Sequence, residues 1–222
     1  MENWKMLSVV ARGLAGFGRD TAFVGGAAVA LHVTDAAAPP PRPTDDVDVV
    51  VEIVSRLDFH KSEEALRSLG FRRSVAAGGS ICRWQYKGLN VDIMPTDAAA
   101  LGFHNRWYAD GLRAAEDFPL PDGTVVRAFS LPHMLASKIE AFLGRGRGDF
   151  TASHDIEDIF ALLDGAPRAL DKIRAAAPPV RSYLVDRFSR FLQDPRFVQS
   201  AEGHLPEPGR ADRALTLLRS LR

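Results

Sequence analysis

Residues 42–51 read RPTDDVDVVV, a polar lead-in that runs into a series of valines. The valine series predicts a β-strand over residues 46–53, and its Val and Ile content suggests burial on both faces. Side chains alternate along a strand, so Asp46 and Asp48 would point to one face and Asp45 to the other. Two carboxylates on one face of a rigid strand suit a hard cation such as Mg²⁺. An Asp-x-Asp pair also arises by chance, so its surroundings decide its meaning.

A pair of glycines, Gly25 and Gly26, lies between a short apolar run at residues 23–24 and a helical pattern over residues 27–33. Glycines between a strand and a helix allow phosphate oxygens to approach backbone N–H groups, and a helix N-terminus attracts negative charge. The pattern lacks the Lys-Ser/Thr of a P-loop and the third glycine of a dinucleotide-binding motif. Taken alone, it favours a tight turn.

A third carboxylate, Asp92, lies in an apolar run over residues 89–94 that predicts another strand, where it shares a face with Asn90. Burying such a carboxylate is costly unless it is paired, hydrogen-bonded or bound to a metal. If this strand lies beside the strand at 46–53, three carboxylates converge, and a cation would relieve their repulsion. The alternative is an ion pair with an arginine such as Arg83.

The order of the predicted elements indicates an α+β (mixed α/β) fold. We expect a small mixed β-sheet flanked by helices in residues 1–129 and a helical region in residues 130–222. The predicted helices cover residues 3–16, 27–33, 56–69, 130–143, 154–164, 167–175, 179–192 and 209–221. Besides those at 23–24, 46–53 and 89–94, strands are expected at 71–75, 81–86, 116–120 and 124–128, with turns at Gly78-Gly79, Lys87-Gly88 and Asp122-Gly123.

The chain is neutral overall, with 28 Lys and Arg against 28 Asp and Glu, so it is no strongly basic nucleic-acid binder. The charge is uneven, because residues 165–222 contain 11 Lys and Arg against 6 Asp and Glu, while residues 35–64 are acidic. A basic region with a carboxylate site suits a substrate that carries phosphates. Amphipathic helices with solvated arginines explain the pattern equally well.

The single cysteine, Cys82, excludes a disulfide within the chain and suits a reducing cytoplasm, where we expect the protein. Its apolar neighbours favour a core position rather than a nucleophile. The N-terminal residues lack the long apolar segment of a signal peptide. No run of 18 apolar residues exists, so we expect no membrane span.

Three motifs in order, FVGGAA at 23–28, R-x-T-x-D-x-D at 42–48 and VDI at 91–93, resemble the nucleotidyltransferase core of the DNA polymerase β superfamily. More narrowly, the chain resembles the AbiEii-type nucleotidyltransferase family, which includes toxins of bacterial toxin–antitoxin and abortive-infection systems. That family has a lysine on a downstream helix and a Lys-Asp-x-x-Asp signature on the next helix. This chain has LASKIEAF at 135–142 and HDIEDI at 154–159, and the resemblance covers residues 21–160.

The resemblance implies a role for each matching side chain. The metal ligands would be Asp46, Asp48 and Asp92, which would hold two Mg²⁺ ions. The catalytic set would add Lys138, Asp155 and Asp158, and the nucleotide would contact Gly25, Gly26, Arg42, Thr44 and Lys138. His154 stands where the family usually has lysine, so one phosphate or substrate contact differs.

The downstream residues also have ordinary structural explanations. Lys138, in an otherwise apolar helix, can deliver a point charge to a triphosphate or simply extend from the helix surface to solvent. Asp155 and Asp158 share one helix face, and Asp155 also suits the first turn of any helix. The loop arginines, Arg145 and Arg147, would clamp phosphates or remain solvated.

The activity that the resemblance implies is Mg²⁺-dependent transfer of a nucleoside monophosphate from an NTP to an acceptor hydroxyl, with release of pyrophosphate. The implied acceptor is an RNA end, such as the 3′ end of tRNA, or a protein, and a cognate antitoxin is the implied protein partner. One alternative is a small-molecule nucleotidyltransferase of the aminoglycoside-modifying type. Another is a non-catalytic nucleotide-binding partner, for which His154 is the only support.

Overall fold

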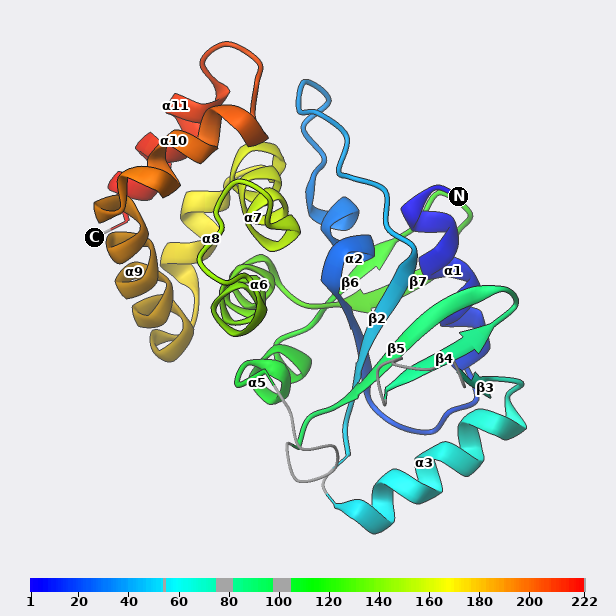
Figure 1. Ribbon diagram of the computed structural model, residues 1–222. Coiled ribbons are helices and arrows are strands. Elements are labelled where there is room, and N and C mark those ends of the chain that lie inside the picture. The colour runs from blue at the N-terminus through cyan, green and yellow to red at the C-terminus, as the bar shows by residue number, and fades with distance from the viewer. Residues whose placement is uncertain (54, 75–81, 98–104, 222) are drawn as a thin grey trace. The chain divides into compact units, whose positions relative to one another are not determined.

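The chain divides into two compact units in the computed structural model, which describes residues 1–53, 55–74, 82–97 and 105–221 (Figure 1). Unit 1 contains residues 1–31 and 42–130, and unit 2 contains residues 32–41 and 131–222. The turn expected at Gly78-Gly79 lies outside the described residues.

Unit 1 is built on a seven-stranded mixed sheet with the strand order β3-β4-β5-β2-β1-β7-β6. β2 pairs with β5 in parallel and with β1 antiparallel, and β1 pairs with β7 in parallel. The hairpins β4–β5 and β6–β7 are antiparallel, as the turns at residues 87–88 and 122–123 predict. The strands are β1 (Thr21–Val24), β2 (Asp46–Val51), β3 (Arg72–Arg73), β4 (Arg83–Tyr86), β5 (Leu89–Pro95), β6 (Glu116–Pro119) and β7 (Val125–Ala128).

The core of the sheet is the valine-rich strand β2. Val47, Val49, Val50 and Val51 are all fully buried, which confirms the prediction of burial on both faces beyond residue 48. The aspartates occupy the less buried first positions of the strand. Cys82 is also buried, as expected for a core cysteine.

Among the described helices of unit 1, α1 and α3 follow their sequence signals closely. They are α1 (Asn3–Leu14), α2 (Gly25–His32, whose last residue belongs to unit 2), α3 (Arg56–Ser68) and α5 (Tyr108–Arg113). α1 packs on β2 and β7. In α3, the Ser55 hydroxyl accepts a hydrogen bond from the Asp58 N–H, and Gly70 takes the positive φ of 89° expected for the residue after a C-cap. α5 was not predicted, since its six residues show no complete apolar period.

The glycine pair differs from its prediction, because α2 begins at Gly25 itself instead of after the glycines. Gly25 has a φ of 74°, which L-residues with a side chain rarely adopt. A Cβ atom at this position would lie 1.8 Å from the Asp48 carboxylate oxygen Oδ2. Glycine is therefore required twice over, by its backbone conformation and by the close approach of Asp48.

Unit 2 is helical from Leu131 onward. Its helices are α6 (Leu131–Arg145), α7 (His154–Gly165), α8 (Ala169–Ala175), α9 (Pro178–Gln193), α10 (Pro195–His204) and α11 (Arg210–Arg219). α10 was not predicted, although Asp194 caps it and Pro195 occupies its first turn, which is a recognisable start signal. The core of the unit contains a cluster of phenylalanine rings whose centroids lie 4.9–6.4 Å apart: Phe142, Phe150, Phe160, Phe188, Phe191 and Phe197.

The proline-rich segment at residues 32–41 belongs to unit 2, although its position in the sequence places it within the N-terminal part. The backbone N–H groups of Thr34 and Asp35 both donate to the carbonyl of Gly165 at 3.1 Å. The Asp35 carboxylate lies 3.6 Å from the guanidinium of Arg213. These contacts join residues far apart in sequence, which local sequence patterns do not reveal.

We expect Gly25→Ala to destabilise the protein more than Gly18→Ala. Both glycines have similar positive φ angles, 74° and 69°, but a Cβ atom at Gly18 meets nothing within 4 Å. The backbone strain should cost about 1 kcal/mol in both variants, and the clash with Asp48 should add about 1–3 kcal/mol in Gly25→Ala only. Chemical denaturation followed by circular dichroism measures both. Equal losses would show that Asp48 does not constrain Gly25.

Candidate functional site: carboxylates on the central strands

Three carboxylates meet on neighbouring strands of unit 1. The parallel pairing of β2 with β5 places Asp48 directly beside Asp92, and Asp46 precedes Asp48 by two residues on the same face. On the other side of Asp48 lies Val24, the last residue before the glycine pair. From the sequence, we expected the three carboxylates to converge if these two strands were neighbours, and the strands are neighbours.

We call Asp46, Asp48 and Asp92 the carboxylate row. Arg83 lies next to it on β4, directly opposite Asp92. Its Nε and Nη2 donate to the two carboxylate oxygens of Asp92 at 2.9 and 2.7 Å, and Nη2 also donates to Asp46 Oδ2 at 2.9 Å. The ion pair considered as an alternative for Asp92 is thus present, and it extends to Asp46. The hydrogen bond with Asp92, together with the charges of all three aspartates, raises the pKa of the Arg83 guanidinium, although partial burial opposes the shift.

The lead-in residues support this site from the start of β2. The Thr44 hydroxyl donates to Asp46 Oδ1 at 2.9 Å and so orients that carboxylate. A Cβ atom at Gly26 would lie 2.8 Å from Arg42 Nη2, which places the Arg42 guanidinium beside the first turn of α2. Arg42, Thr44 and the glycine pair therefore lie together, as a nucleotide-contacting group requires.

The donor chemistry of the three aspartates fits Mg²⁺, which prefers carboxylate oxygens and is commonly held by one or two of them together with substrate phosphates. Asp46 and Asp48 on one strand, with Asp92 beside them, offer this set. As the side chains stand, however, Arg83 Nη2 bridges Asp46 and Asp92. Within residues 1–53, 55–74, 82–97 and 105–221, no three His, Cys, Asp or Glu side chains are grouped as a metal ion would require.

A second charged cluster lies in unit 2 and contains the other three predicted catalytic residues. Lys138 Nζ lies 3.3 Å from Asp155 Oδ1 and 2.5 Å from Asp158 Oδ2, and these three side chains are no more than 6% exposed. Lys138 is therefore buried, which excludes the surface position that the sequence left open. Arg145, the last residue of α6, donates to both oxygens of Asp155 at 3.0 Å.

The helix geometry explains this cluster. Lys138 and Arg145 are seven residues apart on α6, and Asp155 and Asp158 are three apart on α7, so each pair shares one helix face. Burial by itself would raise the pKa of Asp155, but the charges of Lys138 and Arg145 and their hydrogen bonds outweigh it, and the pKa is lowered. His154 lies outside this cluster, since it is exposed and its Nδ1 lies 3.1 Å from the Glu157 carboxylate.

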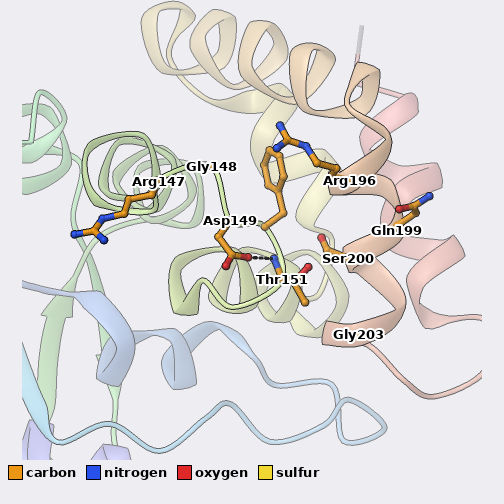
Figure 2. Close-up of a pocket in the computed structure, with 9 residues that line it drawn as sticks. Arg147, Gly148, Asp149, Thr151, Arg196, Gln199, Ser200 and Gly203 are labelled. Atoms are coloured by element: carbon orange, nitrogen blue, oxygen red, sulfur yellow. Dashed lines mark hydrogen bonds between the residues drawn. The ribbon is translucent and has the colours of Figure 1, made fainter.

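A separate pocket of about 470 Å³ lies in unit 2 between the loop that follows α6 and helix α10 (Figure 2). Arg147, a candidate phosphate ligand, stands at its edge with the side chain directed away from Thr151 and Ser200. Apart from Arg147, no residue predicted to bind phosphate, nucleotide or metal or to take part in catalysis lines this pocket. Its lining residues are Arg147, Gly148, Asp149, Phe150, Thr151, Arg196, Gln199, Ser200 and Gly203.

Solved structures with this fold include two nucleotidyltransferase-like proteins. A nucleotidyltransferase-like antigenic protein from Paracoccidioides brasiliensis superposes with a TM-score of 0.54 at 22% identity, over 85% of this chain and 88% of that one. The antibiotic-resistance factor ANT(2'')-Ia superposes with a TM-score of 0.51 at 13% identity, over 87% of this chain and 97% of that one. The fold is therefore of the nucleotidyltransferase class. Among curated proteins, none matches the sequence significantly.

The family follows from the sequence as a whole. The model of the AbiEii family, described as the nucleotidyl transferase AbiEii toxin of type IV toxin–antitoxin systems, matches residues 9–212. The chain belongs to this family and is a nucleotidyltransferase, rather than the non-catalytic partner considered as an alternative. In the part of the chain that the structure describes, no helix is long and apolar enough to cross a membrane.

Two arginines at these clusters, Arg83 and Arg145, were underestimated from the sequence. Lys87 and Gly88 both have positive φ, which defines a two-residue hairpin turn. Counting back from this turn pairs Arg83 with Asp92, so the turn supports the ion pair that the sequence offered as the alternative for Asp92; the further contact of Arg83 with Asp46 was not foreseen. For Arg145, the spacing of seven residues from Lys138 was the available signal.

We expect Asp155→Asn to lower the stability of the protein at pH 7 by about 3 kcal/mol, because it removes one partner from a buried ion cluster. The native pKa of Asp155 is lowered, so its contribution is fully present above its ordinary pKa and is lost as the pH falls through the native value. The difference between wild type and variant should therefore shrink below pH 3.8. Urea denaturation at several pH values measures this. A difference that does not change with pH would contradict the assignment.

Proposed function

We propose that this protein transfers a nucleoside monophosphate from an NTP to the hydroxyl of an acceptor, with Mg²⁺ as cofactor and pyrophosphate as the leaving group. The observation that carries the proposal is the register of β2 and β5, which aligns Asp48 with Asp92 next to a helix that starts at a glycine pair. Membership of the AbiEii family supports the reaction class.

The proposal gives each residue of unit 1 a defined task. Asp46, Asp48 and Asp92 would hold the cation, and the Asp92 carboxylate would also assist removal of the proton from the acceptor hydroxyl. Mg²⁺ supplies neutralisation of the developing negative charge on the phosphate and the leaving group. Thr44 orients Asp46 through its hydrogen bond at 2.9 Å. Gly25 and Gly26 present N–H groups at the start of α2 to the triphosphate, beside the charge of Arg42.

In unit 2, we assign Lys138 to the nucleotide phosphates and Asp155 and Asp158 to holding the Lys138 ammonium in position. The short contact with Asp158 and the burial of all three side chains support a positioning role. Arg145, whose own side chain is exposed, contacts the buried Asp155 carboxylate at 3.0 Å. In this structure, the Lys138 ammonium is paired with both Asp155 and Asp158.

The proposed acceptor is the end of an RNA, such as the 3′ end of tRNA. The excess of five positive charges in residues 165–222 supports an acceptor with a phosphate backbone. Several of these arginines pair with neighbouring acids, among them Arg168 with Asp171 and Arg190 with Asp186, so the support lies in the net charge of the region. The family further suggests a cognate antitoxin as partner, and we place the protein in the cytoplasm.

A second candidate acceptor is a small cationic molecule of the aminoglycoside type. The observation that favours it is the similarity of the fold to an antibiotic-resistance factor over nearly the whole of both chains. Charge distinguishes the two candidates, because a cationic acceptor requires acidic surroundings and an RNA requires basic ones.

We expect Asp48→Asn to abolish nucleotide transfer and Asp45→Asn to leave it nearly unchanged. Asp45 is exposed and directly precedes Asp46, the first residue of β2, so it is a matched control from the same segment. The assay supplies each of the four α-labelled NTPs with Mg²⁺ and total RNA, and label on RNA is measured. The loss in Asp48→Asn should be at least ~100-fold. Equal activity of wild type and Asp48→Asn would refute the assignment.

The same labelled reaction also decides the acceptor. Total RNA, an RNA-free protein extract and an aminoglycoside mixture are supplied in separate reactions. Label on RNA supports the proposal, whereas label on protein or on the aminoglycoside would replace it with that acceptor. Growth arrest on expression, absent in Asp48→Asn, would connect the transfer to toxicity.

A further inference from the structure

Arg83 is a cation already present among the carboxylates to which the proposed function assigns a metal. The guanidinium of Arg83 contacts both carboxylate oxygens of Asp92 through Nε and Nη2, and Nη2 also contacts Asp46. The charges of Asp46, Asp48 and Asp92 all act on it. The group of four side chains keeps a formal charge of −2, since three carboxylates face one guanidinium.

The fold explains why this arginine is needed. The Asp92 side chain is only 13% exposed, and an ionised carboxylate at that depth requires a counter-charge. β4 provides one from the directly opposite position in the hairpin, because Arg83 and Asp92 face each other across the ladder. The guanidinium matches the planar carboxylate with two parallel hydrogen bonds, which is a strong and specific geometry.

The contact with Asp46 has a different character from the contact with Asp92. It uses a single nitrogen that is already hydrogen-bonded to Asp92, and both Arg83 and Asp46 are about one third exposed. The hydrogen bond from Arg83 to Asp46 can therefore break while the two hydrogen bonds from Arg83 to Asp92 remain. Asp46 is also held by Thr44, so its carboxylate keeps one partner when Arg83 leaves.

A divalent cation attracted to Asp46 and Asp92 would compete with Nη2 of Arg83, which contacts both carboxylates. Both need the same carboxylate oxygens, and two positive charges at that spacing repel each other strongly at the low effective dielectric constant of a partly buried site. A free cation must therefore displace Arg83 from Asp46. A cation that arrives with a triphosphate brings anionic oxygens that provide Arg83 with a replacement partner.

We propose that Arg83 is an internal counter-ion that keeps the carboxylate site closed to free divalent cations and turns from Asp46 to the phosphates when the metal arrives with a nucleotide. This inference rests on the proposed function, since it concerns the same carboxylates. It adds Arg83 to the nucleotide-contacting residues and makes cation and nucleotide binding cooperative.

The test measures Mn²⁺ binding to metal-free protein by electron paramagnetic resonance of the free ion, without nucleotide. Arg83→Gln should bind Mn²⁺ at least ~10-fold more tightly than wild type, because one positive charge has gone from the site. The matched control is Arg19→Gln, since Arg19 also contacts both oxygens of a single aspartate, Asp58, and lies away from the carboxylate row. Arg19→Gln should bind Mn²⁺ like wild type.

A second measurement adds a non-hydrolysable NTP analogue. The analogue should increase the Mn²⁺ affinity of wild type by a larger factor than that of Arg83→Gln, because only wild type has a guanidinium to relocate. Unchanged or weaker Mn²⁺ binding by Arg83→Gln without nucleotide would overturn the proposal. If Arg83→Gln fails to fold, Arg83→Met decides, since it also removes the charge and keeps a long unbranched side chain, and wild-type affinity in that variant would overturn the proposal.

These measurements are independent of turnover. A failure of the proposed function appears as absence of nucleotide transfer by wild type. A failure of the counter-ion role appears in the Mn²⁺ affinities alone, whether or not the protein transfers nucleotides.

Discussion

The parallel pairing of β2 with β5 is the constraint on which the carboxylate site depends. Its register sets Asp48 beside Asp92 in adjacent strands, and strands in a sheet lie about 4.8 Å apart. Two carboxylates at that spacing repel each other by roughly 3 kcal/mol at an effective dielectric constant near 20. The surrounding residues compensate for this repulsion, with Arg83 opposite Asp92 and Thr44 on Asp46.

The two charged clusters of the chain are balanced differently. In unit 2, Lys138 and Arg145 match Asp155 and Asp158, so that cluster is neutral and almost entirely buried around Lys138. In unit 1, Arg83 is shared between Asp46 and Asp92, and the Asp46 side chain remains about one third exposed. The first arrangement holds the Lys138 ammonium in position, and the second holds two carboxylates from neighbouring strands with one guanidinium.

The sequence was most informative where local patterns act alone. The valine run predicted β2, the Asp-Gly and Lys-Gly turns predicted two hairpins, and the apolar periods predicted most of the helices. The sequence does not predict the short helix α5, which lacks a full apolar period, or α10, whose main local sign is the Asp-Pro pair at its start. The pairing of β2 with β5 was foreseen only as a condition, since parallel strands from separate parts of the chain leave no local sign of their neighbours.

The candidate site shows the same division. The chain order of the motifs indicated which residues belong together, and alternation along β2 separated Asp46 and Asp48 from Asp45. The sequence did not reveal which charged side chains pair with one another or how deeply they are buried. The sharing of Arg83 between two aspartates depends on side-chain reach across three strands, and the burial of Lys138 depends on how α6 packs against α7.

The attachment of residues 32–41 to unit 2 has a consequence for the order in which the protein matures. This segment separates the helix of the glycine pair from the strand of the aspartates, and its contacts include the Gly165 carbonyl and Arg213. A ribosome therefore releases the motif-bearing half of the chain long before the residues that anchor this segment. The contacts that anchor residues 32–41 can therefore form only when almost the entire chain has been made, and a fragment that ends at residue 130 would lack that anchor.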